Sequence, residues 1–183
     1  MLILSAEVAL VRAFRVTEYD PAYQAGIDAM MAGIAQEYDQ PISGPQSVKL
    51  FEAHGRPNQR YWVALDDKRV VGTVGLVLLK GPNAVLKRMM TDKDYRGETG
   101  LAVRLLEAAV EWGRAQGVQT VYLGTMAQFK AAQRFYAKHG CVEVQLSELP
   151  DDMAVNPIDC LHYRLALSTV DDGSAEEGRY PPG

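Results

Sequence analysis

The pattern of apolar and polar positions changes its period several times along the chain, and each change predicts a new element. Residues 8–16 alternate irregularly and predict a first strand. Asp20-Pro21 then opens a predicted helix, because aspartate caps free N–H groups and proline fits a first helical turn. This helix should run to about Tyr38. A polar loop over residues 39–45 and a short second helix over residues 47–54 are expected to follow.

The middle of the chain is rich in apolar and β-branched residues. Residues 60–65 and 70–79 favour two strands, and the charged tetrapeptide between them, residues 66–69, predicts a hairpin. The turn-forming sequence Gly81-Pro82-Asn83 ends the second of these strands. Residues 84–91 then predict a third strand, antiparallel to the second.

The second half of the chain alternates between helical and strand patterns. A long amphipathic helix is predicted over residues 100–116, closed by Gly117. Its expected buried stripe consists of Leu101, Leu105, Ala108, Ala109 and Trp112. The remaining predicted elements are a strand over 118–125, a helix over 129–139 closed by Gly140, and a strand pair over 141–146 and 160–167.

This order of elements predicts an α/β (α+β) fold with a mixed, mostly antiparallel central sheet and helices on both faces. The one expected parallel crossover is the strand–helix–strand unit around residues 96–125. The length of 183 residues suits one domain, which we expect over residues 1–167. The polar, acidic residues 168–183 are expected to form a disordered tail.

Composition restricts the classes of partner. With a net charge of −4, the chain has no general attraction for nucleic acid or anionic membranes. Cys141 and Cys160 are expected to be buried free thiols, and the three histidines have no metal-binding spacing, so no metal is predicted. No apolar run is long enough to span a bilayer and no signal peptide is recognisable, so a cytoplasmic protein is expected.

The segment from Asp94 to Gly117 carries the first candidate chemistry. A short charged turn with Gly97 and Gly100 joins a strand to the long helix. First-turn N–H groups of a helix lack internal partners, and glycine lets the backbone approach an anion. The turn therefore predicts a site for a phosphorylated cofactor, although neither a Walker A motif nor a dinucleotide fingerprint is present. A basic patch is expected around it, formed by Lys87, Arg88, Lys93 and Arg96.

Two short segments narrow this prediction. The first is the strand end Met89-Met90-Thr91 with the loop Arg96-Gly97-Glu98-Thr99-Gly100-Leu101-Ala102, and the second is the helical segment from Phe129 to Cys141, which contains Phe135-Tyr136 and Gly140. They resemble the Q/R-x-x-G-x-G/A and N-x-x-A-x-x-F-Y-x-K-x-G-F motifs of the GCN5-related N-acetyltransferases (GNAT), whose element order matches residues 8–167.

The chain departs from these motifs at three points. One extra residue lies between Arg96 and Gly100, so either the loop bulges or Gly97 takes the arginine position. Phe129 replaces the family asparagine, which puts a side-chain contact to the pantetheine arm in doubt. Cys141 replaces the usual phenylalanine after the glycine.

The resemblance implies that acetyl-CoA is the co-substrate and that no metal takes part. The backbone N–H groups of residues 96–102 would hold the pyrophosphate, with Arg96 adding charge. The strand carrying Met89, Met90 and Thr91 would separate from the next strand, so that the pantetheine arm pairs with its main chain and a free N–H stabilises the oxyanion. Phe135 would belong to the same cofactor site. An ordinary turn and a plain buried strand are the alternatives for these segments.

Tyr136 is the expected catalytic residue. The resemblance places it near the sulfur of the thioester, where a phenol with a pKa of about 10 is protonated and donates a proton to the leaving thiolate. The alternative is a core aromatic side chain beside Phe135.

The activity implied by the resemblance is transfer of an acetyl group to a primary amine by direct attack, in a V-shaped cleft of the sheet. Two alternatives stay open: a non-catalytic acyl-CoA sensor of the same fold, and a structural domain that binds no CoA. The acceptor would be a small-molecule or peptide amine, and the fold class allows a homodimer through the late strands.

No general base is identified from the sequence. The candidates are expected to be surface charges or satisfied polar groups; they are Glu37, Asp39, Glu143 and His162. The loop over residues 148–159 would form the far wall of the acceptor pocket. Its three aspartates, Asp151, Asp152 and Asp159, either favour a cationic acceptor or form a solvated acidic loop.

Overall fold

The computed structural model describes residues 13–43 and 55–167. These residues form a seven-stranded sheet with the order β1-β2-β3-β4-β5-β7-β6. Neighbouring strands are antiparallel except β4 and β5, which are parallel. The strands are β1 (Arg15–Glu18), β2 (Gln59–Asp66), β3 (Arg69–Leu78), β4 (Asn83–Thr91), β5 (Thr120–Thr125), β6 (Val142–Val144) and β7 (Leu161–Ala166). The expected mixed, mostly antiparallel sheet is confirmed.

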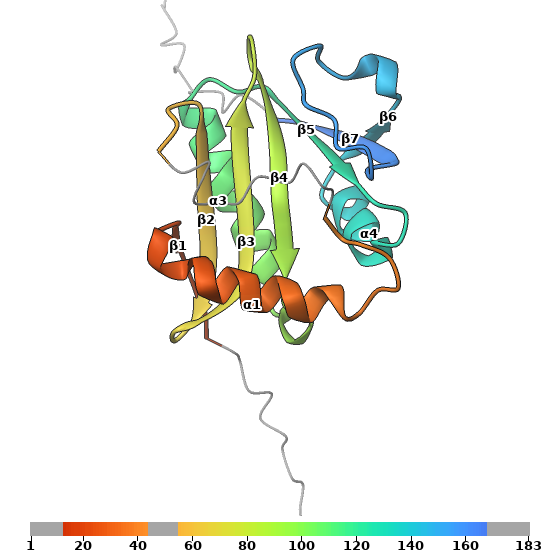
Figure 1. Cartoon of the computed structure of the whole chain (residues 1–183). Helices are drawn as coiled ribbons and strands as arrows, with labels where there is room; N and C mark the ends of the chain where they lie inside the picture. Colours follow the sequence, from red (N-terminus) through yellow and green to blue (C-terminus); the bar gives the residue numbers. More distant parts are fainter. Residues whose placement is uncertain (1–12, 44–54, 168–183) are drawn as a thin grey trace, which may run out of the picture.

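The α-helices of the described residues are α1 (Gln24–Ala35), α3 (Leu101–Ala115) and α4 (Lys130–Lys138). Helix α1 crosses one face of the sheet and α3 lies on the other (Figure 1). The crossover from β4 through α3 to β5 is the expected parallel connection.

Two apolar clusters fill the spaces between the sheet and its helices. Ile27 and Met30 of α1 pack with Val63 of β2, whereas Leu101 and Leu105 of α3 pack with the opposite face. Strands β2 and β3 are therefore buried on both sides, which explains why the sequence shows continuous apolar runs there rather than strict alternation. The buried face of α3 is wider than the predicted stripe: Leu106 and Val110 are also buried, and Trp112 only partly.

Local capping signals fix several element ends. The Asp20 side chain accepts a hydrogen bond from the Ala22 amide (2.8 Å), as expected for a cap, in front of the 3₁₀ helix Pro21–Tyr23. Helix α1 then ends at Ala35, three residues before the expected end at Tyr38. Gly117 and Gly140, with φ of 80° and 82°, follow α3 and α4 in the expected positions.

Some predicted boundaries were wrong and others fall outside the described residues. Strand β1 covers only Arg15–Glu18, and residues 8–12 and the helix expected over 47–54 are not described. The strand expected over 141–146 is limited to Val142–Val144, because a 3₁₀ helix, Leu146–Glu148, begins soon after it.

The prediction of two buried thiols is correct for Cys141 and wrong for Cys160, which is exposed. Cys160 lies one residue before β7 begins, at the end of a loop, so the apolar residues that follow it do not bury it.

Candidate functional site

The sheet opens between β4 and β5. The two strands pair only over Asn83–Val85 and Thr120–Tyr122, although β4 continues to Thr91 and β5 to Thr125. Beyond Val85 the strands diverge, which is the separation expected for this part of the chain (Figure 1). Main-chain groups along the diverging part of β4 therefore have no strand partner on the β5 side.

A β-bulge lies in the diverging part of β4. Thr73 of β3 is opposite Met90 and Gly75 is opposite Lys87, so Val74 faces two residues, Arg88 and Met89. Arg88 has φ of 52°, which is uncommon for a residue other than glycine, and its carbonyl accepts a hydrogen bond from Thr73 Oγ1 (2.8 Å). A bulge re-aims the side chains that follow it.

The bulge changes which residues of β4 reach each face. Met89 packs on the α3 side of the sheet and Met90 on the α1 side. Lys87 and Arg88, although adjacent, both line a cavity on the α1 side. The basic patch expected around residues 96–102 is therefore wrong for these two side chains, which lie in the cavity instead.

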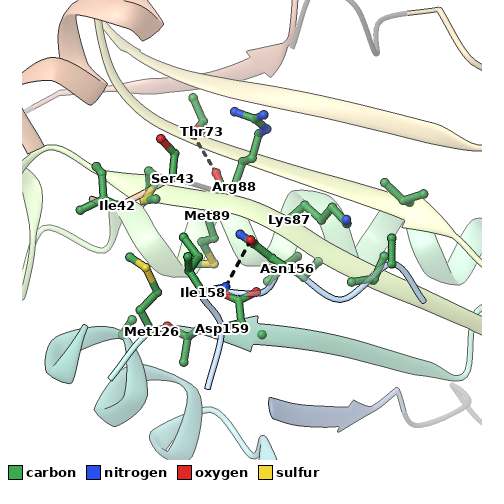
Figure 2. Close-up of a pocket in the computed structure, with 18 of the residues that line it drawn as sticks. Ile42, Ser43, Thr73, Lys87, Arg88, Met89, Met126, Asn156, Ile158 and Asp159 are labelled. Carbon is green, nitrogen blue, oxygen red and sulfur yellow. Dashed lines mark hydrogen bonds between the residues drawn. The ribbon is translucent and has the colours of Figure 1, made fainter. Parts of the chain in front are cut away.

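The cavity has a volume of about 440 Å³ and continues into the opening between β4 and β5. Apolar side chains make up much of its wall; among them are Ile27, Met31, Ile42, Met126, Phe129 and Ile158. Figure 2 shows Lys87 and Arg88 on β4, with Asp159 and Met126 on the β5 side of the cavity. A pocket of this size, largely apolar with a few polar groups, is typical of a small-molecule site.

Tyr136 of α4 lines this cavity and is only 5% exposed. Its ring packs against the rings of Phe135 and Tyr163, with centroids 5.7 and 6.0 Å away. Burial raises the pKa of its phenol, and the nearby Cys141 and Asp159 raise it further. The phenol is therefore protonated at neutral pH and can act as a hydrogen-bond or proton donor.

Asp159 is the only carboxylate among the described residues that line the cavity. It approaches β5 closely: a Cβ at position 124 would lie 2.5 Å from Asp159 Oδ2, so only glycine leaves room for the carboxylate there. Burial raises the pKa of Asp159, whereas His162 and Lys87 lower it. A carboxylate with a raised pKa is a better proton acceptor than one in water.

The loop over residues 148–159 forms part of the cavity wall, as expected, through residues 153–159, and Asp159 is the one of its three aspartates in the described lining. Asp152 is exposed and its Oδ2 accepts a hydrogen bond from the Lys80 amide (2.7 Å). Asp151 is exposed and does not line the cavity.

The loop before α3 has the geometry of an anion site. Gly97 and Gly100 have φ of 79° and 75°, and nothing lies within 4 Å of a Cβ built on either. The first hydrogen bond of α3 runs from the Arg104 amide to the Gly100 carbonyl, so the amides of Ala102 and Val103 have no partner within the helix. The open space at the two glycines and the two amides left unpaired within the helix suit the binding of an anion such as a phosphate group.

Arg96 has an ion pair of its own. Its Nη1 and Nη2 bind the two carboxylate oxygens of Glu37 at 2.6 and 2.9 Å, and its Nε donates to the Thr91 carbonyl at 3.1 Å. Glu37 is thus a paired charge rather than a base. The Arg96 guanidinium thus connects the segment after α1 to the start of the loop over residues 96–102. No local pattern in the sequence indicates this contact.

The predicted site residues fall into two groups. Met89, Met90 and Tyr136 line the cavity. The loop residues Arg96, Gly97, Glu98, Thr99, Gly100, Leu101 and Ala102, together with Thr91 and Phe135, lie outside the described lining of the cavity. Phe135 packs against His139 with ring centroids 4.1 Å apart.

His162 differs from the expectation of a satisfied polar group. Its residue is 7% exposed, and its Nε2 has no hydrogen-bond partner among the described residues. It lies opposite Gly124 in the pairing of β5 with β7, so it is one strand away from the contact between Asp159 and β5.

Residues 27–141 match the model of the acetyltransferase (GNAT) family. An uncharacterized N-acetyltransferase of Escherichia coli, YjgM, is 30% identical over 111 residues, which are 59% of this chain and 66% of the relative. The chain thus matches slightly less than two thirds of the length of this relative.

Two crystal structures share the fold. A GNAT-family acetyltransferase from Staphylococcus aureus is 26% identical to this chain, with a TM-score of 0.77, and the match covers 85% of this chain and 100% of the Staphylococcus chain. The PaiA N-acetyltransferase of Thermoplasma acidophilum, in complex with coenzyme A, has a TM-score of 0.63 and 13% identity, covering 85% of this chain and 99% of its own. Among the described residues, no helix is long and apolar enough to cross a membrane. The family match over most of the sheet and its crossover shows that this chain belongs to the GNAT family of acetyltransferases.

Proposed function

We propose that this protein is an acetyl-CoA-dependent N-acetyltransferase that acts on a primary amine by direct attack. The observation that carries the proposal is the opening between β4 and β5, where a protonated phenol, Tyr136, and a carboxylate, Asp159, line the same cavity. The match to the GNAT family and the coenzyme A complex of the Thermoplasma neighbour both support a coenzyme A thioester as the ligand.

Acetyl-CoA would bind along β4 and the loop over residues 96–102. The pyrophosphate would accept hydrogen bonds from the first-turn amides of α3, where Gly97 and Gly100 leave open space. The pantetheine amides would pair with the diverging part of β4, as an added strand pairs with a sheet edge. Arg96 would hold the loop in place through Glu37 and Thr91 rather than bind phosphate itself.

The reaction requires two proton transfers. The neutral amine attacks the thioester carbon, and Asp159 accepts the proton that the amine nitrogen loses. The tetrahedral intermediate then collapses: the carbon–sulfur bond breaks, and the thiolate receives a proton from the Tyr136 hydroxyl. Main-chain N–H groups at the β4 bulge would stabilise the oxyanion. Holding amine and thioester together supplies much of the rate.

Two measurements test this function. Thermal unfolding with acetyl-CoA tests binding, because a ligand at 100 times its Kd adds about 2.7 kcal/mol of stability. Release of free CoA, with the acetylated amine identified by mass spectrometry, tests turnover over an amine panel. A thermal shift without CoA release would support a non-catalytic acyl-CoA sensor instead. The absence of any shift would refute both functions.

A further inference from the structure

The charges in the cavity are unequal in number. Among the described residues that line it, three are cationic, Arg56, Lys87 and Arg88, and one, Asp159, is anionic. This excess of positive charge disfavours a cationic acceptor, which was one of the two alternatives for the acidic loop over residues 148–159. A polycationic acceptor would meet repulsion here.

Lys87 is the cation whose surroundings most favour an anionic ligand. It is partly buried on β4 and points into the cavity region shown in Figure 2. No carboxylate of the described residues forms an ion pair with it within 4.0 Å. Burial lowers the pKa of its ammonium group, and Asp159 opposes this effect from a distance. A partly buried cation that has no carboxylate partner in the described part of the chain is costly, so an anionic ligand would relieve that cost.

The bulge places a second cation beside the first. Arg88 follows Lys87 at the bulge, where the regular alternation of β4 is interrupted, and it belongs to the same cavity lining. Arg56 adds a third positive charge. Across from them, Asp159 and the apolar side chains of Met126 and Ile158 form the β5 side of the cavity (Figure 2).

We propose that the acceptor is an amine that also bears a carboxylate, of the apolar α-amino acid class, with its carboxylate on Lys87 and its amine toward Asp159. The apolar side chain would contact Met126 and Ile158. This assignment rests on the proposed acetyl transfer at the same cavity. It separates free amino acids from polyamines, aminoglycosides and peptide N-termini, which lack a carboxylate next to the amine.

Binding can be measured separately from turnover, by calorimetry on the protein saturated with CoA. The ligands are leucine, leucinamide, which has the amine but no carboxylate and stands for a peptide N-terminus, and spermidine. We expect leucine to bind on the order of 10- to 100-fold more tightly than leucinamide, the range for a hydrogen bond to a charged group. Spermidine should bind more weakly than either.

Lys87→Met should remove most of the preference for leucine without weakening leucinamide binding, whereas Lys87→Arg, which keeps the charge, should retain the preference. Lys68→Met, at an exposed turn outside the cavity, is the matched control and should bind as the parent does. Equal affinity for leucine and leucinamide, or equal losses for both in Lys87→Met, would overturn the assignment. Leucine binding with this preference but no acetyl transfer would uphold the carboxylate site and refute the proposed catalysis.

Discussion

Replacing Gly124 by alanine tests whether the close approach of Asp159 to β5 is needed for catalysis. The new Cβ would lie 2.5 Å from Asp159 Oδ2 and 3.0 Å from its Cβ and Cγ, whereas ordinary contacts begin at 3.4 Å. The carboxylate must therefore retreat by roughly 1 Å, a misplacement that can cost about 100-fold in rate. Because Asp159 lies on a loop, we expect it to move while β5 stays in place.

The expected result is a fall in kcat of about 100-fold, with acetyl-CoA affinity unchanged and a loss of stability of about 1–3 kcal/mol from overpacking. Steady-state release of CoA gives kcat, calorimetry gives the affinity, and thermal unfolding gives the stability. Gly33→Ala is the control, because nothing lies within 4 Å of a Cβ at that exposed helical position. It should keep full activity and gain about 0.5–1 kcal/mol of stability.

Asp159→Asn distinguishes displacement of the carboxylate from general damage to the site. If Gly124→Ala acts only through Asp159, the double variant should be no slower than Asp159→Asn alone, since both changes remove the same group. A Gly124→Ala protein with the parental kcat would refute the reasoning, and so would a further loss in the double variant.

Three more outcomes follow from contacts described above. Tyr136→Phe should lower kcat by about 100-fold or more with acetyl-CoA affinity nearly unchanged. The control is Tyr163→Phe, the same change at a residue outside the cavity lining, which should have little effect on kcat. Equal kcat in both variants would remove Tyr136 from the mechanism. Arg96→Lys should weaken acetyl-CoA binding as much as Arg96→Gln, because lysine keeps the charge but cannot form both hydrogen bonds to the Glu37 carboxylate. Calorimetry measures both affinities, and full affinity in the lysine variant would favour a direct contact between Arg96 and phosphate. Burial raises the pKa of Cys141 to about 11, so at pH 8 only about one Cys141 thiol in a thousand is ionised. A thiol reagent should therefore label the exposed Cys160 first. Mass spectrometry of the labelled peptides shows the order of labelling, and faster labelling of Cys141 would contradict this prediction.

Elements set by nearby residues were predictable from the sequence. The β2–β3 hairpin, the Asp20 cap and the glycines after α3 and α4 each depend on local pattern or local backbone geometry. The crossover from β4 to β5 followed from the order of elements, whereas the place where the sheet opens was expected only from the resemblance to the GNAT motifs.

The acceptor side of the site was not predictable in this way, because its contacts join distant positions. The bulge at Arg88 depends on pairing with Thr73, fifteen residues earlier, and no glycine or asparagine marks its positive φ. The ion pair between Glu37 and Arg96 spans 59 residues. Asp159 had the appearance of one charge in an acidic loop, and only its position against Gly124 sets it apart.

The short pairing between β4 and β5 has a consequence for how the molecule opens and closes. Only three residue pairs join these two strands of nine and six residues. A ligand that fills the opening would lie between β4 and β5 as an additional strand would, and its contacts with both strands would link them beyond their three paired residues. Amide hydrogen exchange along β4 and β5 should therefore slow together when the ligand binds, even at amides the ligand does not touch. The co-substrate would then be part of the cooperative unit of the fold as well as the source of the acetyl group.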